Sequence, residues 1–177
     1  DVSAKPVTHR RAVAGARIVM QASTLRLARA NRLVKGNVFE TARLAYGEQV
    51  LWPDHCVQGT DGANLHKDLA IPTAQLVIRK GYHKDVDSYS AFMEADGKTK
   101  TGLDGYLKSR GINSVYVCGL ATDFCVAWTA LDARKLGFAA AVIEDASRGI
   151  DTHGSLAAAW DNMKKAGVKR IQSGVIA

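Results

Sequence analysis

The chain has 177 residues, of which 47% are hydrophobic, and a formal net charge of +7. This length allows one substantial core and is too short for two ordinary domains. No apolar run approaches the roughly 20 residues that a membrane span needs, so we expect no membrane partner. The three cysteines lie at unrelated spacings and predict no disulfide framework, which favours a cytoplasmic protein.

The positive charge is confined to the N-terminal part of the chain. Residues 1–40 contain eight Lys and Arg but two acids, a net charge of +6, which leaves +1 for the rest. A nucleic-acid site interleaves basic and aromatic side chains, yet Phe39 is the only aromatic residue in this segment. We therefore expect no nucleic-acid partner. Residues 1–36 resemble a transit peptide or an exposed basic helix, and we predict an atypical segment over 1–36 and one domain over 37–177.

Residues 41–74 do not follow the period of a helix or of a strand. Proline and glycine punctuate them at Pro53, Gly59, Gly62 and Pro72. A long irregular segment inside a compact domain is more often functional than accidental. This part of the chain is therefore where we first look for site residues.

From about residue 75 onward, predicted strands alternate with predicted helices. This alternation is typical of a parallel sheet covered by helices, and it predicts a three-layer α/β/α domain whose N-terminal part is incomplete or irregular. The strands are expected at 75–79, 114–118, 139–143 and 168–171, and the helices at 101–110, 123–136 and 155–166.

Cys125 is the candidate nucleophile. It follows a predicted strand and a turn with Gly119, at the start of a predicted helix. The N-terminus of a helix stabilises a thiolate and offers backbone N–H groups to an oxyanion. The alternative is that Cys125 is a buried small hydrophobic residue, as free cysteines frequently are. We expect Cys118, inside a strand, to be such a core residue.

Two further residues are candidates on weaker grounds. Lys80 ends a predicted strand, where a solvated lysine is the ordinary interpretation, but the carboxyl edge of an open α/β sheet is also where ligands bind. His55 could bind a metal through its imidazole or could be a hydrogen-bonded loop histidine. Trp52 could belong to the core or to an aromatic pocket. We interpret Asp151 and His153, spaced like metal ligands, as a helix N-cap region.

Four segments together resemble the nicotinamidase/pyrazinamidase branch of the isochorismatase-like cysteine hydrolases. They match in order and approximate spacing, and the resemblance covers the chain from about Phe39 to Ile171. The segments are 51–60 (LWPDHCVQGT), 79–81 (RKG), 87–92 (DSYSAF) and 119–126 (GLATDFCV).

The resemblance implies a reaction and the residues that perform it. Members of this family have a parallel sheet between helices, and this branch hydrolyses nicotinamide to nicotinate and ammonia in NAD salvage. By resemblance, Cys125 attacks the carboxamide to form a thioester, and Lys80 supports the thiolate. The backbone N–H groups of Ala121 and Cys125 would form the oxyanion hole, after a cis peptide bond between Leu120 and Ala121.

The resemblance also implies a ring pocket and a cofactor. Trp52 and Tyr89 would line the pocket for nicotinamide or pyrazinamide, the expected small-molecule substrates. His55 matches one ligand of a divalent metal, zinc, iron or manganese, that holds the pyridine nitrogen. A homo-oligomer is compatible with the family.

The first 40 residues depart from the family pattern. The family's catalytic aspartate motif (Asp-x-x-x-Asp-Phe) and its metal-binding Asp-x-His motif are missing, and Asp1 only faintly echoes the former. We hypothesise that this segment is truncated or read in another frame. Three functions follow: a nicotinamidase by descent, an impaired relative that acts as a binding or subunit protein, and another isochorismatase-type hydrolase. The motif from Trp52 to Cys56 argues against the third.

Overall fold

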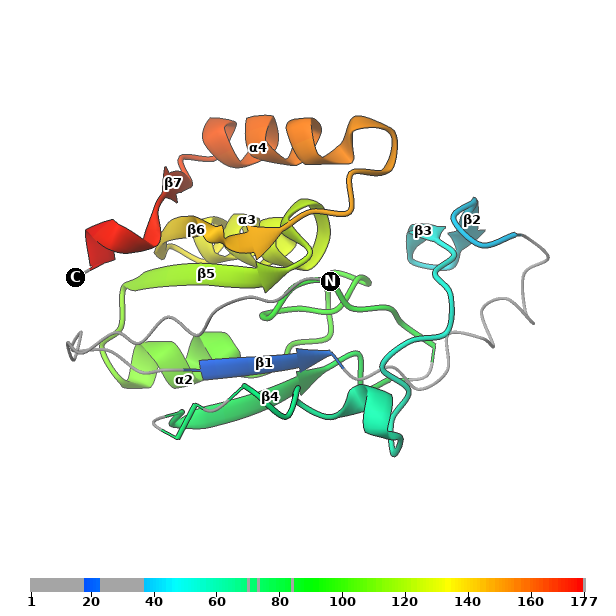
Figure 1. The fold of residues 1–177 in the computed structure, drawn as a ribbon, viewed down its shortest axis with the longest axis horizontal. Coiled ribbons are helices and arrows are strands. Elements are labelled where there is room, and N and C mark those ends of the chain that lie inside the picture. Colours follow the sequence, from blue (N-terminus) through cyan, green and yellow to red (C-terminus); the bar gives the residue numbers. More distant parts are fainter. Residues whose placement is uncertain (1–17, 23–36, 70, 73, 84, 177) are drawn as a thin grey trace.

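The computed structural model describes residues 18–22, 37–69, 71–72, 74–83 and 85–176, the first of these ranges by its backbone only. Its parallel strands form two groups (Figure 1). In the first, β1 (Ile18–Ala22) pairs with β4 (Leu76–Lys80) in a register that sets Ala22 opposite Lys80. In the second, the order is β5 (Ser114–Leu120), β6 (Ala139–Arg148) and β7 (Lys169–Ile171). Over the described residues, no ladder of hydrogen bonds joins the two groups.

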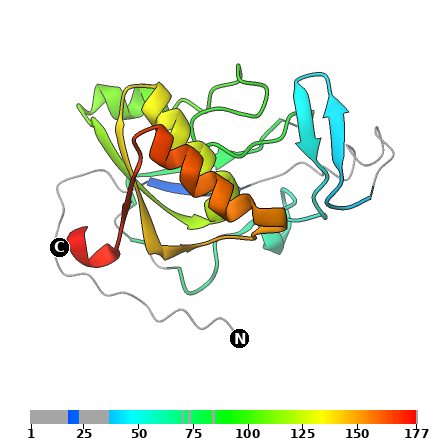
Figure 2. The ribbon, with the colours of Figure 1, turned by 90° about the horizontal axis from the view of Figure 1, so that it is seen from above.

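Within the described residues, three α-helices accompany these strands. Figure 2 shows α3 (Ala127–Lys135) and α4 (Ser155–Lys165) side by side over the three-stranded group. The shorter α2 (Leu103–Ser109) contributes Leu103 and Leu107 to the core. In the described part of the chain, no helix is both long and apolar enough to cross a membrane. The predicted α/β architecture with parallel strands is confirmed.

Some of the predicted helices and strands differ from the observed ones in their boundaries. Strands β5 and β6 run further than expected, and the helix expected at 123–136 begins with a π-helical turn, Thr122–Val126. Three strands were not predicted, namely β1 and the two strands of an antiparallel hairpin, β2 (Thr41–Leu44) and β3 (Gly47–Val50). The prediction that Cys118 belongs to the core is wrong, because its side chain is exposed. The helical stripe considered at 25–33 lies outside the described residues.

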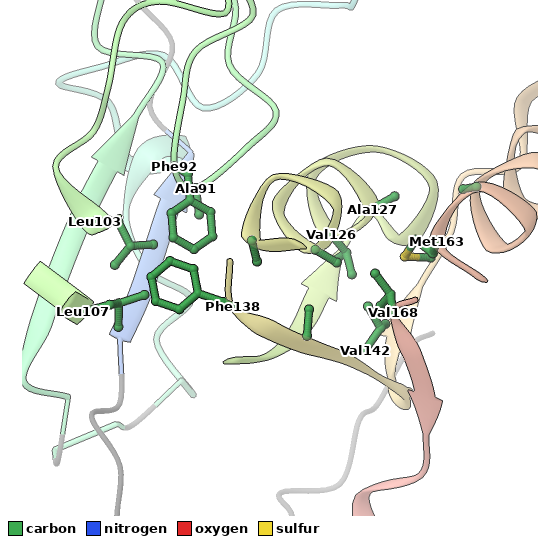
Figure 3. Packing of buried hydrophobic residues seen from close by; sticks show 14 residues of the cluster. Ala91, Phe92, Leu103, Leu107, Val126, Ala127, Phe138, Val142, Met163 and Val168 are labelled. Atoms are coloured by element: carbon green, nitrogen blue, oxygen red, sulfur yellow. The ribbon is translucent and has the colours of Figure 1, made fainter. Parts of the chain in front are cut away.

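The core lies between the sheet and the helices (Figure 3). Phe92 and Phe138 stack with their ring centroids 5.7 Å apart, and each is 2% exposed. Alanines on the inner face of α3, such as Ala130 and Ala133, are fully buried and let the helix approach the strands closely. Met163 on α4 fills the space above Val142 of β6. This packing fixes the carboxyl ends of the strands, where the candidate site lies.

We predict that Phe138→Ala lowers the free energy of unfolding by about 3–5 kcal/mol, because the change leaves a cavity beside Phe92. Urea unfolding followed by circular dichroism measures this loss. Tyr116→Ala is the control, because Tyr116 is 56% exposed and its removal should cost less than about 1 kcal/mol. Equal losses in the two variants would contradict the packing described here.

Candidate active site

Lys80 and Cys125 meet at the carboxyl ends of β4 and β5. The Lys80 side chain is buried, and its Nζ lies 3.3 Å from Cys125 Sγ. The same Nζ donates a 2.6 Å hydrogen bond to the carbonyl oxygen of Ser88. A buried ammonium needs such partners, since its transfer out of water is costly. The position expected for Lys80, at the carboxyl edge of the sheet, is therefore confirmed.

The turn that carries Cys125 is built from an unusual backbone. Gly119 has a φ of 119°, which favours glycine, and the Leu120–Ala121 peptide bond is cis, as the family resemblance implied. Ala121 is the N-cap of the π-helical turn, which holds Cys125 and continues directly into α3. Thr129 on α3 donates a 2.6 Å hydrogen bond to the carbonyl oxygen of Cys125. The cysteine thus sits at a helix start, where its sulfur faces Lys80.

Asp123 ties this turn to the loop that precedes α4. Its buried carboxylate accepts hydrogen bonds from the backbone N–H groups of Ile150 (3.0 Å) and Asp151 (2.8 Å) and from Ser155 Oγ (2.5 Å). Burial raises the pKa of the Asp123 carboxyl, but these hydrogen bonds outweigh burial and hold that pKa below its ordinary value. Sequence reasoning missed Asp123, although it lies two residues before Cys125.

Aromatic side chains gather beside Cys125. Phe124 lies edge-on to Trp52, with centroids 4.7 Å apart, and 6.1 Å from the ring of Tyr89. Tyr89 in turn lies 5.6 Å from Trp128 of α3. The structure therefore brings the two predicted pocket residues, Trp52 and Tyr89, next to the neighbour of the cysteine. Phe124 and Trp128 were not predicted, although their spacing of four residues on one helical face was a usable signal.

A buried polar network holds the predicted pocket residues. The Tyr89 hydroxyl accepts hydrogen bonds from Trp52 Nε1 and from Gln49 Nε2, both at 2.7 Å. Gln49 Nε2 also lies 2.5 Å from Asp87 Oδ2. Burial, followed by the negative charge of Asp87, raises the pKa of the Tyr89 hydroxyl far above its ordinary value. The hydroxyl therefore stays protonated, and neither Gln49 nor Asp87 had been singled out from the sequence.

The expected metal site is not assembled from the described residues. His55 is exposed, and its Nδ1 lies 2.7 Å from the carbonyl oxygen of Pro53. In the part of the chain that the structure describes, no group of three or more His, Cys, Asp or Glu side chains could hold a metal ion. Asp151 precedes a short 3-10 helix, and its carboxylate accepts the N–H of Leu156 at 3.2 Å. Asp151 and His153 therefore lie in the segment that leads into α4, as the N-cap-region interpretation expected, although the N-cap residue of α4 itself is Gly154.

Comparisons with known proteins agree with this geometry. A nicotinamidase of Acinetobacter baylyi is 63% identical over 135 residues, which cover 76% of this chain and 63% of that protein. The solved structure of an Acinetobacter baumanii nicotinamidase/pyrazinamidase has a TM-score of 0.87 at 57% identity and covers 92% of this chain and 79% of that one. A Pyrococcus horikoshii pyrazinamidase, solved in complex with zinc, has a TM-score of 0.67 at 30% identity and covers 89% and 75%.

The chain spans less than two thirds of the length of these curated relatives, namely 63% of the Acinetobacter baylyi protein and 48% of the Escherichia coli nicotinamidase. A second kind of protein also matches. A cyclic pyranopterin monophosphate synthase of Parvibaculum lavamentivorans is 56% identical over 45 residues, which cover 25% of this chain and 28% of that protein.

The family itself is settled by a match along most of the sequence. The model of the isochorismatase domain matches residues 7–173. The solved structures above share both the fold and at least 30% of the sequence. The chain therefore belongs to the isochorismatase family.

Proposed function

We propose that this chain is a nicotinamidase-like amidohydrolase that converts nicotinamide to nicotinate and ammonia, a step of NAD salvage. The observation that carries the proposal is the 3.3 Å approach of Lys80 Nζ to Cys125 Sγ beside an aromatic cluster. The names of the relatives at 63% and 57% identity support the same reaction and the same kind of small-molecule substrate.

The proposed chemistry begins at the sulfur of Cys125. The thiolate attacks the carboxamide carbon, a C–S bond forms, and the C–N bond breaks to release ammonia. The thiol proton ends on the leaving nitrogen. Water then hydrolyses the thioester and frees the acid. The Lys80 ammonium stabilises the negative charge on sulfur, and the N–H groups of Ala121 and Cys125 stabilise the oxyanion.

Trp52 and Tyr89 would hold the substrate ring. Trp52 is 8% exposed and packs edge-on against Phe124, the residue before Cys125, so it offers a rigid apolar surface. Flat aromatic rings gain most from such surfaces, since aromatic pairs attract beyond their buried area. This favours nicotinamide or pyrazinamide as substrate over an aliphatic amide.

Binding of the divalent metal that the family implies depends on which described residues could serve as its ligands. His55 remains our candidate for one ligand, by family resemblance. The described residues supply no second and third ligand beside it, so they do not fit the divalent ion that the family implies. We therefore route no step of the proposed reaction through a metal.

We also propose that the N-terminal segment, predicted at 1–36, has a different ancestry from the hydrolase domain, although the match to the isochorismatase domain begins at residue 7. The match to the nicotinamidase covers 76% of the chain, and the match to the pyranopterin synthase covers 25%. Six of the seven net positive charges lie in residues 1–40. We infer that the synthase match lies in this segment, which favours separate ancestry over a shifted reading frame. Separate ancestry would also leave the chain without the aspartate of the family, which is the reason for keeping one alternative function, an impaired relative that binds the ring without efficient turnover.

We predict that the purified chain releases ammonia from nicotinamide, and that Cys125→Ala lowers the rate by about 10⁴-fold or more because the nucleophile is lost. A coupled ammonia assay, with zinc or manganese added, measures the rate. Cys118→Ala is the matched control, because Cys118 is an exposed cysteine of β5 and should be replaceable without loss. No release above the Cys125→Ala background would remove the hydrolase proposal for this chain and leave the binding alternative.

We predict that Asp123→Asn lowers the free energy of unfolding by about 1–3 kcal/mol at pH 7, because the buried hydrogen bonds lose their charged acceptor. The folded-state pKa of Asp123 lies below its ordinary value of 3.8. The charged carboxylate therefore stabilises the fold above that value and ceases to do so as the pH falls through the folded-state pKa. Urea unfolding at pH 7 and at a pH below that folded-state pKa should show the variant and the parent converging at the lower pH.

The control for this test is Asp161→Asn, which changes an exposed carboxylate on α4. It should leave stability within about 0.5 kcal/mol at both pH values. A difference between Asp123→Asn and the parent that is the same at pH 7 and at low pH would show that the charge of Asp123 does not anchor the loop.

We predict that exchanging residues 1–45 for the N-terminal part of the Acinetobacter baylyi nicotinamidase raises the rate of nicotinamide hydrolysis by about 10²–10⁴-fold, the usual contribution of one acid or base. The exchange would supply the aspartate that the family resemblance calls for. The control exchanges the same residues for the matching segment of the pyranopterin synthase and should leave the rate unchanged. A large loss in that control, or no gain in the first exchange, would contradict separate ancestry.

A further inference from the structure

Gln49 is a buried amide that links three parts of the molecule. It lies on β3, is 1% exposed, and reaches from the hairpin to the hydroxyl of Tyr89 in the aromatic cluster. Its Nε2 has three acceptors within 2.8 Å: Val50 O, Asp87 Oδ2 and the Tyr89 hydroxyl oxygen. Its Oε1 accepts a 3.3 Å hydrogen bond from Tyr46. Both ends of the amide are thus used inside the protein.

The orientation of this amide is fixed by chemistry. Asp87, 4% exposed, only accepts hydrogen bonds when ionised, so it selects the NH₂ end of Gln49. The other oxygen of Asp87 accepts the N–H of Ser88 at 2.7 Å. Ser88 is the residue whose carbonyl oxygen binds Lys80. The amide of Gln49 is therefore joined to the segment that holds the catalytic lysine of the proposed reaction.

The Tyr89 hydroxyl is saturated by these partners. A phenolic oxygen accepts two hydrogen bonds and donates one. Trp52 Nε1 and Gln49 Nε2 take both acceptor positions at 2.7 Å. The indole N–H of Trp52 is used by the same oxygen. Both aromatic residues therefore offer ring surface to a bound molecule and no polar atom.

We propose that Gln49 is a positioning residue that sets the mutual angle of Trp52 and Tyr89 and thereby the preference of the site for a flat aromatic amide. The inference about substrate preference rests on the proposed function. The positioning of Trp52 and Tyr89 by Gln49 can be tested in a chain without activity. Without the Gln49 N–H, the Tyr89 hydroxyl and Asp87 lose a shared donor at the point where the two rings meet. Binding of the ring, rather than the chemical step at Cys125, would then weaken.

The test exchanges the donor and acceptor of the Gln49–Asp87 pair. Gln49→Glu has almost the same shape but sets a second carboxylate against Asp87, so one of the two must take up a proton. We expect KM for nicotinamide to rise about tenfold at neutral pH with little change in kcat, and to recover as the pH falls. The double variant Gln49→Glu/Asp87→Asn restores a donor facing an acceptor and should recover most of the loss at neutral pH.

The second measurement needs no activity. Incorporation of 5-fluorotryptophan gives a ¹⁹F resonance for each of the three tryptophans, and Trp52→Phe identifies that of Trp52. In Gln49→Glu, the Trp52 resonance should shift with pH and follow one titration, whereas in the parent it should not. If Gln49→Glu does not fold at neutral pH, the double variant alone carries the test through its Trp52 resonance.

Gln172→Glu is the matched control, because Gln172 Nε2 makes the same kind of contact with Glu144 Oε2, at 2.9 Å, on the exposed side of the molecule. It should change neither KM nor the Trp52 resonance. A loss in Gln49→Glu that appears in kcat and stability only, with no pH recovery and no rescue by the double variant, would overturn the positioning role. A parent without activity whose Trp52 resonance still titrates in Gln49→Glu would overturn the proposed function and leave the geometric inference standing.

Discussion

The buried ammonium of Lys80 is the constraint on which the arrangement of the site depends. Lys80 is 6% exposed, and its ammonium needs polar partners, because the free-energy cost of removing a charge from water exceeds the free energy gained by packing. Its two partners come from different places, the carbonyl oxygen of Ser88 and the sulfur of Cys125. Satisfying one ammonium therefore brings the end of β4, the 87–92 segment and the turn after β5 to one point. The two groups of parallel strands share no ladder within the described residues, so this contact is one of the links between them.

Two further buried carboxylates repeat this logic at the sides of the site. Asp123 collects donors from the loop before α4, and Asp87 collects donors from β3 and from its own segment. In each case a charged acceptor with several donors fixes a loop that has little apolar surface of its own. The residues that contact the substrate in our proposal are therefore held in place by Asp123 and Asp87, which do not contact it. Such support is what keeps the geometry of an active site within the narrow range that catalysis needs.

Much of the fold could be predicted from hydrophobic patterning, and the failures have physical causes. Strands such as β4 and helices such as α4 follow the expected periods and ended within a residue or two of prediction. The hairpin of β2 and β3 was missed because its buried residue on β3 is Gln49, a polar residue that breaks the apolar alternation. Strand β1 was missed because it lies in an arginine-rich segment. Cys118 was assigned to the core because strand composition does not say which face or edge is covered.

Among the candidate residues, the sequence placed Lys80, Cys125, Trp52 and Tyr89 in one neighbourhood only through family resemblance, since they span more than 70 positions. The supporting residues Asp123 and Gln49 could not be predicted, because one polar residue in a sequence gives no sign that its side chain is buried and hydrogen-bonded to several partners.

The polar atoms of Trp52 and Tyr89 are both hydrogen-bonded within the protein, and this has a consequence for inhibitors. A hydroxyl or amine added to a ring where it faces this pair would lose its water without a partner, at a cost of roughly 1–3 kcal/mol, whereas a methyl or halogen would not. Affinity for the rings of Trp52 and Tyr89 is therefore gained by shape and lost by polarity.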